Sequence, residues 1–300
     1  NSMFKNILII GFGMIGSSIA RTVLKNNKSV KIYALDKSSS IERRLKKAKL
    51  SSVICLKSFD QVDKIQIDLI IVCTPVLQYK SIFQKISKLK RSNFIVTDVG
   101  STKLNIEKIY KSEKFQFRFV PSHPIAGIEK SGLEYGFDGL FDNRYNLICP
   151  LKNTSKLDIN KISNFWKSLS MKIDIMTSKE HDHVLSLTSH LPHVISYSLV
   201  LTAMKKEKSL NSKLVKFSAG GFRDFTRVAG SDPEMWRDIF LANSDQIQQL
   251  TNAFIKELKT FSKSLNAQNS NRLLKKLELT KKVRNRIVKA RQAGKFIPND

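Results

Sequence analysis

The sequence predicts an α/β domain with a doubly wound, mostly parallel sheet, followed by an all-α domain. In the first half, short apolar runs typical of buried strands alternate with segments of helical periodicity. After residue 178 no strand-like run remains, and apolar residues recur at helical spacing. We therefore expect an α/β domain over residues 1–178 and a helical domain over residues 179–300.

Composition narrows the class of protein. The chain has 300 residues, of which 41% are hydrophobic and 26% charged, as in soluble globular proteins. Its net charge of +27 comes mostly from lysine, since 39 of the 52 basic residues are lysines and they are scattered. Arginine is the preferred reader of phosphates and base edges, so we expect no nucleic-acid partner. No apolar run approaches the roughly 20 residues that cross a bilayer, so we expect no membrane partner. Three widely spaced cysteines in apolar segments favour the cytoplasm.

A glycine motif follows the first strand-like run. Residues 7–10 are wholly apolar and lead into G-x-G-x-x-G, after which a helical pattern begins. Gly11 permits a tight turn, Gly13 lets the backbone approach a pyrophosphate, and Gly16 allows close helix–strand packing. The N-terminus of the helix then faces the phosphates. The sequence therefore predicts a Rossmann domain whose cofactor loop consists of Gly11, Phe12, Gly13, Met14, Ile15 and Gly16.

The next strand-like runs supply further cofactor contacts. Asp36 ends the second run, 20 residues after Gly16. A carboxylate at this point accepts hydrogen bonds from ribose hydroxyls and repels a 2′-phosphate. We therefore predict NAD as the cofactor, with NADP left open because Lys37 and Ser38 can tolerate a phosphate. The run 68–73 ends at Thr74 and Pro75, where the chain would pass the cofactor's ribose or nicotinamide.

Two side chains are candidates for proton transfer. His123 lies between two prolines, which exclude a regular helix and a central strand. A histidine on a stiff loop is a candidate base near neutral pH, although an ordinary turn can carry one without a function. Ser101 follows the strand-like run 94–97, at the edge of the sheet where ligands bind. A serine there can also cap the helix that we expect from Thr102, and the two roles are compatible.

The second half concentrates four of the five histidines in one predicted helix, 180–205. His190 and His193 are three residues apart and lie near one face, whereas His181 and His183 point away from each other. No cysteine completes a zinc set, so we predict no metal. We expect one or two of these histidines to face a cleft.

Arginine, scarce elsewhere, gathers in residues 218–237. Arg223 and Arg227 share a helical face, and each can either fork a carboxylate or pair structurally with an acid such as Asp224 or Glu129. Residues 247–265 carry apolar side chains at a 3-4 spacing, which suits a partner helix. That helix belongs either to residues 273–287 or to a second subunit, so a homodimer is a hypothesis.

Taken together, these residues resemble the prephenate/arogenate dehydrogenase family of tyrosine biosynthesis. The resemblance covers nearly the whole chain in the family's order. The His-Pro-Ile-Ala-Gly and Phe-Arg-Asp-Phe-Thr-Arg segments are specific to the family, and the glycine motif is not. The matching segments are Gly11–Gly16, Thr97-Asp98 with Ser101 and Lys103, Ser122–Gly127, Ser189–His193, and Gly220–Arg227 with Asp232, Pro233 and Trp236.

The resemblance implies an active site between a Rossmann domain and a helical dimerisation domain. His123 would take the proton of the substrate's 4-hydroxyl as hydride leaves the same carbon for NAD, and decarboxylation would make the ring aromatic. Ser101 would orient the hydroxyl or His123. The implied substrate-binding residues are Arg227, which would pair with a substrate carboxylate, and His193, Gly220 and His190. Glu129 and Asp224 would form part of a polar gate.

Alternatives remain open at this point. Prephenate is preferred to arogenate, but no residue that reads the differing side chain is identifiable. β-Hydroxyacid dehydrogenases share the architecture, yet they carry a catalytic lysine on the interdomain helix, where this chain has histidines. A non-catalytic NAD-binding regulator or nucleic-acid binder would leave the placement of His123 and Arg227 without an explanation.

Overall fold

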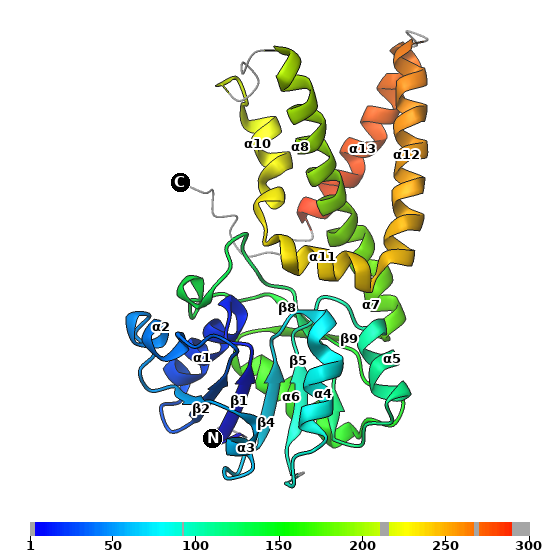
Figure 1. Cartoon of the computed structure of the whole chain (residues 1–300). Coiled ribbons are helices and arrows are strands. Elements are labelled where there is room, and N and C mark those ends of the chain that lie inside the picture. The colour runs from blue at the N-terminus through cyan, green and yellow to red at the C-terminus, as the bar shows by residue number, and fades with distance from the viewer. Residues whose placement is uncertain (1–3, 92, 211–215, 267–269, 290–300) are drawn as a thin grey trace.

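The computed structural model describes residues 4–91, 93–210, 216–266 and 270–289, which form an α/β domain and a helical domain (Figure 1). The α/β domain contains a six-stranded parallel sheet in the order β3-β2-β1-β4-β5-β6. This is the order of a doubly wound Rossmann sheet, so the predicted fold class is confirmed. The strands are β1 (Asn6–Ile10), β2 (Lys31–Leu35), β3 (Ile54–Leu56), β4 (Leu69–Val72), β5 (Ile95–Asp98) and β6 (Phe119–Val120).

Strand β1 is apolar because both of its faces are covered. Ile7 and Ile9 enter one hydrophobic core, and Leu8 and Ile10 enter the other. A parallel strand between two helical layers loses the apolar–polar alternation of a half-exposed strand. The connecting helices are α1 (Met14–Asn26), α2 (Ile41–Lys47), α3 (Phe59–Val62), η1 (Val76–Gln78), α4 (Tyr79–Ile86) and α5 (Leu104–Ser112).

A second, three-stranded sheet follows β6. It has the order β7-β8-β9, with β7 antiparallel to β8 and β8 parallel to β9. The expected His123 loop is therefore partly an edge strand, a position that tolerates its two flanking prolines. Both β7 and β3 are too short to produce a recognisable sequence pattern. The elements of this part are β7 (Ser122–Pro124), η2 (Leu133–Tyr135), β8 (Tyr145–Ile148), α6 (Lys156–Ser168) and β9 (Lys172–Ile175).

The described residues beyond 178 are helical and contain no strand. The long helix predicted over 180–205 runs from α7 through a π-helical segment, η3, into α8. Figure 1 shows α8, α10, α12 and α13 standing away from the sheet, while α11 lies across the junction of the two domains. These elements are α7 (Ser178–Leu185), η3 (Ser186–His190), α8 (Leu191–Leu210), α10 (Gly220–Thr226), η4 (Arg227–Gly230), α11 (Pro233–Ala242), α12 (Ser244–Asn266) and α13 (Ser270–Lys289).

The continuous helical segment formed by α7, η3 and α8 is long and apolar enough to be compared with a membrane-spanning helix. By length and composition, Ser178–Lys206 could cross a membrane, a test that core helices of soluble proteins also pass. Here the segment buries His181, Asp182 and His190 within the fold. Absence of a membrane partner stays a prediction.

The apolar stripe of α12 is only partly covered. Ile247 is buried near the junction of the domains, whereas Leu258 and Leu265 are 53% and 57% exposed. Helix α13 packs against α12 but presents Leu277 and Ile287 to solvent as well. The intrachain partner that the sequence suggested therefore accounts for part of the stripe only.

Candidate active site

The candidate site lies at the carboxyl ends of the parallel strands, where ligands of doubly wound sheets bind. The helical domain closes over this edge of the sheet. Helix α11 packs against η1, which follows β4, and α7 packs against α5, which follows β5. The segments that follow β4 and β5 therefore meet the helical domain here.

The loop after β1 has the backbone geometry of a phosphate cradle. Gly11 has φ +85°, and a Cβ at this residue would lie 2.9 Å from the carbonyl of Cys73. A Cβ on Gly16 would lie 2.8 Å from the Gly11 carbonyl oxygen, whereas nothing lies within 4 Å of one on Gly13. Helix α1 starts at Met14 without a side-chain cap, so no side chain competes with a ligand for its first N–H groups. These features fit a bound pyrophosphate.

The groups beside the cradle fit the rest of a dinucleotide. Asp36 follows β2 and accepts the Phe12 N–H at 2.7 Å and the Ser38 N–H at 2.8 Å, one on each oxygen. Each oxygen keeps a lone pair for a ribose hydroxyl. Thr74 Oγ1 is buried with no hydrogen-bond partner in the described structure, which fits a contact that a ligand completes. Pro75 follows it at the start of η1.

His123 is held through one of its ring nitrogens. Its Nδ1 lies 2.8 Å from Nε2 of His181 on α7, and His123 as a residue is 9% exposed. His181 is fully buried, and its own Nδ1 lies 2.8 Å from Oδ1 of Asp182. Asp182 also accepts the backbone N–H groups of Lys103 and Leu104 at 2.7 and 3.0 Å, at the start of α5. A continuous row of hydrogen bonds therefore links β7, α7 and α5.

Burial keeps the histidines of this site neutral. Desolvation lowers the pKa of His123 well below its ordinary value, and the nearby His181, Lys103 and His190 lower it further. Desolvation likewise lowers the pKa of His181 strongly and that of His190 to about 4. Near pH 7 these imidazoles are unprotonated on one nitrogen and can accept a proton. The opposite effect, desolvation of an acid, raises the pKa of Asp182 against the hydrogen bonds that it accepts from the start of α5.

A buried ion pair supports the end of β5. Lys103 Nζ lies 2.5 Å from Oδ2 of Asp98, and both side chains are fully buried. Asp98 also accepts hydrogen bonds from the Tyr79 hydroxyl and from the N–H groups of Gly100 and Ser122, each at 2.9 Å. Ser122 precedes His123, so this cluster fixes the start of β7.

The turn between β5 and α5 also contains Ser101. Its backbone carbonyl lies close enough to His190 to oppose part of the lowering of that histidine's pKa. His190 Nδ1 lies 3.3 Å from Asn243 Nδ2, while its buried Nε2 has no partner in the described structure. The structure therefore places Ser101 and His190 next to the His123 region, and their predicted roles stay predictions.

The other predicted substrate residues are placed differently. His193 stacks on Trp236 with ring centroids 3.4 Å apart, and its Nδ1 donates to the Ser189 carbonyl at 2.8 Å. Arg227, at the start of η4, pairs with Glu129, which follows β7. Gly220 is exposed at the start of α10, and nothing lies within 4 Å of a Cβ built there. The structure thus does not bring Gly220 to the other residues, and its role stays a prediction.

Sequence reasoning missed two members of this site, His181 and Asp182. A sequence feature could have pointed to them, because Asp182 directly follows His181, one of the four clustered histidines. Helical spacing did separate His181 from His183, and the structure buries the former and exposes the latter. Spacing alone could not say which partner the buried histidine would meet.

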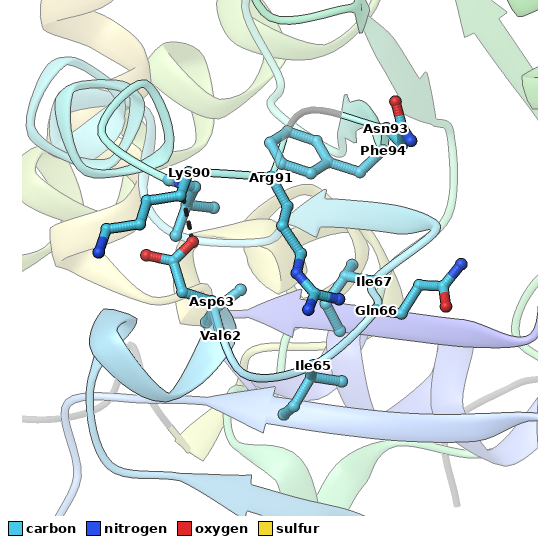
Figure 2. Close-up of a pocket in the computed structure, with 10 residues that line it drawn as sticks. Val62, Asp63, Ile65, Gln66, Ile67, Lys90, Arg91, Asn93 and Phe94 are labelled. Carbon is cyan, nitrogen blue, oxygen red and sulfur yellow. Dashed lines mark hydrogen bonds between the residues drawn. The ribbon is translucent and has the colours of Figure 1, made fainter.

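A separate hollow lies at the opposite edge of the sheet (Figure 2). It is formed by the residues that precede β4 and β5, and the backbone N–H of Lys90 donates to Asp63 across it at 2.8 Å. Because it lies at the amino ends of the strands, it is distinct from the site that the glycine loop defines.

Comparison with known proteins identifies the family. A model described as the nucleotide-binding domain of prephenate dehydrogenase matches residues 19–175, and one described as its dimerization domain matches residues 177–279. The chain belongs to the prephenate dehydrogenase family. A cyclohexadienyl dehydrogenase from Zymomonas mobilis is 34% identical over 94% of this chain and 96% of the relative. A prephenate dehydrogenase from Bacillus subtilis is 33% identical over 92% of this chain and 75% of the relative.

A solved structure extends the likeness to three dimensions. The prephenate dehydrogenase of Aquifex aeolicus, determined with hydroxyphenyl propionate and NAD+, has a TM-score of 0.87 and 31% identity. The alignment covers 94% of this chain and 98% of that one. The expected family and the assignment as an NAD-dependent dehydrogenase are therefore confirmed. The boundary predicted at residue 178 stays a prediction.

Proposed function

We propose that this chain catalyses the NAD-dependent oxidative decarboxylation of prephenate to 4-hydroxyphenylpyruvate, with arogenate as the alternative substrate. The observation that carries the proposal is the position of His123. This buried, neutral imidazole lies between the two domains, on the short strand that follows the sheet's last parallel strand. A base there can reach a substrate that lies against a cofactor bound at the glycine loop.

Each step of such a reaction can be assigned to the bound cofactor or to a residue of the chain. When bound, NAD supplies the acceptor for the hydride that leaves the substrate's hydroxyl-bearing carbon. His123 takes the hydroxyl proton on its Nε2 atom, because its Nδ1 is already engaged. Loss of the ring carboxylate as CO2 then leaves an aromatic ring. A base of this kind typically contributes about 10²–10⁴-fold to the rate.

Substrate carboxylates require cationic or donor groups at the mouth of the site. Arg227 is our proposed anchor, and in the structure its guanidinium pairs with Glu129. A substrate carboxylate would replace Glu129 as its partner. His193, held flat against Trp236, and the unpaired Nε2 of His190 offer further polar contacts. Ser101 would orient the reacting hydroxyl.

Steady-state kinetics with prephenate and arogenate, each with NAD+ and NADP+, test the proposal. We expect the highest kcat/KM for prephenate with NAD+, since Asp36 disfavours a 2′-phosphate. A higher kcat/KM with arogenate would move the assignment to the alternative substrate. Absence of turnover with both substrates would refute the proposed activity.

We also propose that the chain acts as a homodimer in the cytoplasm. The exposed leucines of α12 and α13 form an apolar surface that a second copy would cover, in the part of the chain that matches a dimerization domain. The three cysteines are unpaired, as expected in a reducing compartment. Sedimentation velocity at micromolar concentration should show a dimer, and a monomer would refute this assembly.

A further inference from the structure

The partner of His123 determines what His123 can do. A neutral imidazole has one nitrogen that donates and one that accepts, and only the accepting nitrogen can serve as a base. Which nitrogen accepts is set by the hydrogen bond that the other one makes. In this chain that hydrogen bond goes to His181, on an element of the other domain.

In the row of hydrogen bonds through Asp182, His181 and His123, the donor of each bond can be derived by starting from Asp182. Asp182 receives two backbone N–H groups from the start of α5, and such donors favour its carboxylate form. A carboxylate only accepts, so the proton between Asp182 and His181 is carried by His181 Nδ1. His181 Nε2 is then the accepting nitrogen, and the proton between the two histidines is carried by His123 Nδ1. The lone pair of His123 is left on Nε2.

We propose that His181 is a positioning residue for the reaction: with Asp182 behind it, His181 holds His123 in the tautomer whose Nε2 is the base. The inference rests on the proposed function for its kinetic consequence, but the tautomer itself does not depend on that function. During the reaction, the proton of the substrate's O–H bond goes to His123 Nε2. The Nδ1–H bond of His123 stays intact and its hydrogen bond to His181 strengthens as the ring becomes charged.

The charged groups around His123 and His181 favour the neutral form of both imidazoles. The ammonium group of Lys103 acts electrostatically on both histidines but is paired with Asp98. His190 also acts on both, and its Nδ1 lies 3.3 Å from Asn243. Burial and the nearby Lys103 both disfavour a second positive charge on His181. His181 therefore meets His123 as an acceptor.

Two variants of equal length separate the hydrogen bond from the packing. In His181→Gln the side-chain carbonyl can occupy the position of Nε2 and accept from His123, whereas His181→Met fills similar space without a good acceptor. Both variants equally remove the Nδ1–H group of His181 that donates to Asp182. We expect kcat to fall about 10- to 100-fold in His181→Met, a part of the effect of general-base catalysis, and to stay within about fivefold of wild type in His181→Gln. KM for the substrate and the affinity for NAD+ should change little in either.

His183→Asn is the matched control, because His183 lies on the same helix but is exposed. Among the hydrogen bonds of the described structure, its side chain makes only the one to Gln246, at 3.4 Å. Its kcat should equal that of wild type. Equal losses of kcat in the Gln and Met variants would overturn the proposal, as would a loss that appears in KM instead.

The tautomer can be read without any turnover. The chain has five histidines, so the imidazole nitrogens can be assigned by 15N NMR with single His→Asn variants. In the wild-type protein near pH 7.5 we expect protonated Nδ1 and unprotonated Nε2 on both His123 and His181. Protonated Nε2 on His123 would overturn the proposal even if prephenate is turned over. The expected tautomer in a protein that turns over neither substrate would refute the proposed function alone.

Discussion

Removal of the buried cation beside the site gives a measurable test of the fold's electrostatics. Lys103→Met takes away the ammonium that lies 2.5 Å from Asp98, in a place where neither side chain reaches solvent. Asp98 keeps three neutral donors, the Tyr79 hydroxyl and the N–H groups of Gly100 and Ser122. It loses its only counter-charge among the described residues that hydrogen-bond to it.

The expected loss of stability in Lys103→Met follows from the fact that the buried charge of Asp98 is left uncompensated. Breaking a buried ion pair by removal of one partner typically costs about 3–5 kcal/mol. A domain of this size loses about 2–4 °C in Tm per kcal/mol, so we expect a decrease of roughly 6–20 °C. Differential scanning calorimetry at one fixed protein concentration is the assay, because subunit association makes Tm depend on concentration.

Two controls make the result interpretable. Lys111→Met breaks the exposed i,i+4 pair of α5 with Glu107 and should cost at most about 0.5 kcal/mol. Adding Asp98→Asn to Lys103→Met removes the stranded charge and should restore part of the lost Tm. A decrease of less than about 3 °C in Lys103→Met, or no recovery in the double variant, would refute the reasoning.

Three further predictions concern the site. His123→Asn should lower kcat about 10²–10⁴-fold and leave the NAD+ dissociation constant unchanged; a kcat within about threefold of wild type would exclude His123 as the base. Arg227→Ala should mainly raise KM, because binding common to ground and transition states is lost, and an unchanged KM would remove its role as anchor. Acid should destabilise the fold below pH 6.5: burial lowers the pKa of His190 to about 4, so only the unfolded chain binds that proton between these values. The stability from this group is complete above pH 6.5 and is lost as pH falls toward 4, by roughly 3 kcal/mol. Equal Tm values at pH 7 and pH 5 would contradict this.

Features that depend on neighbours along the chain could be predicted from the sequence. The glycine loop is one, since a strand, a turn with positive φ at Gly11 and a helix start are all encoded within about a dozen residues. The apolar runs of β1 and β4 are another, because a strand covered on both faces must be apolar throughout. The order of such units was sufficient to predict the Rossmann domain and the helical domain, and the motifs marked His123 as a candidate base.

Contacts between side chains that are distant in the sequence could not be predicted in this way. His123 and His181 are 58 residues apart, and their hydrogen bond joins β7 to α7, which packs beside α5. Helical periodicity separates His181 from His183 but does not name a partner for either. The same holds for Lys103, which the sequence marks only as part of a family-like segment and which the structure buries fully against Asp98. Long-range contacts of this kind depend on how whole elements pack, and the row of hydrogen bonds through Asp182, His181 and His123 is therefore visible only in the folded chain.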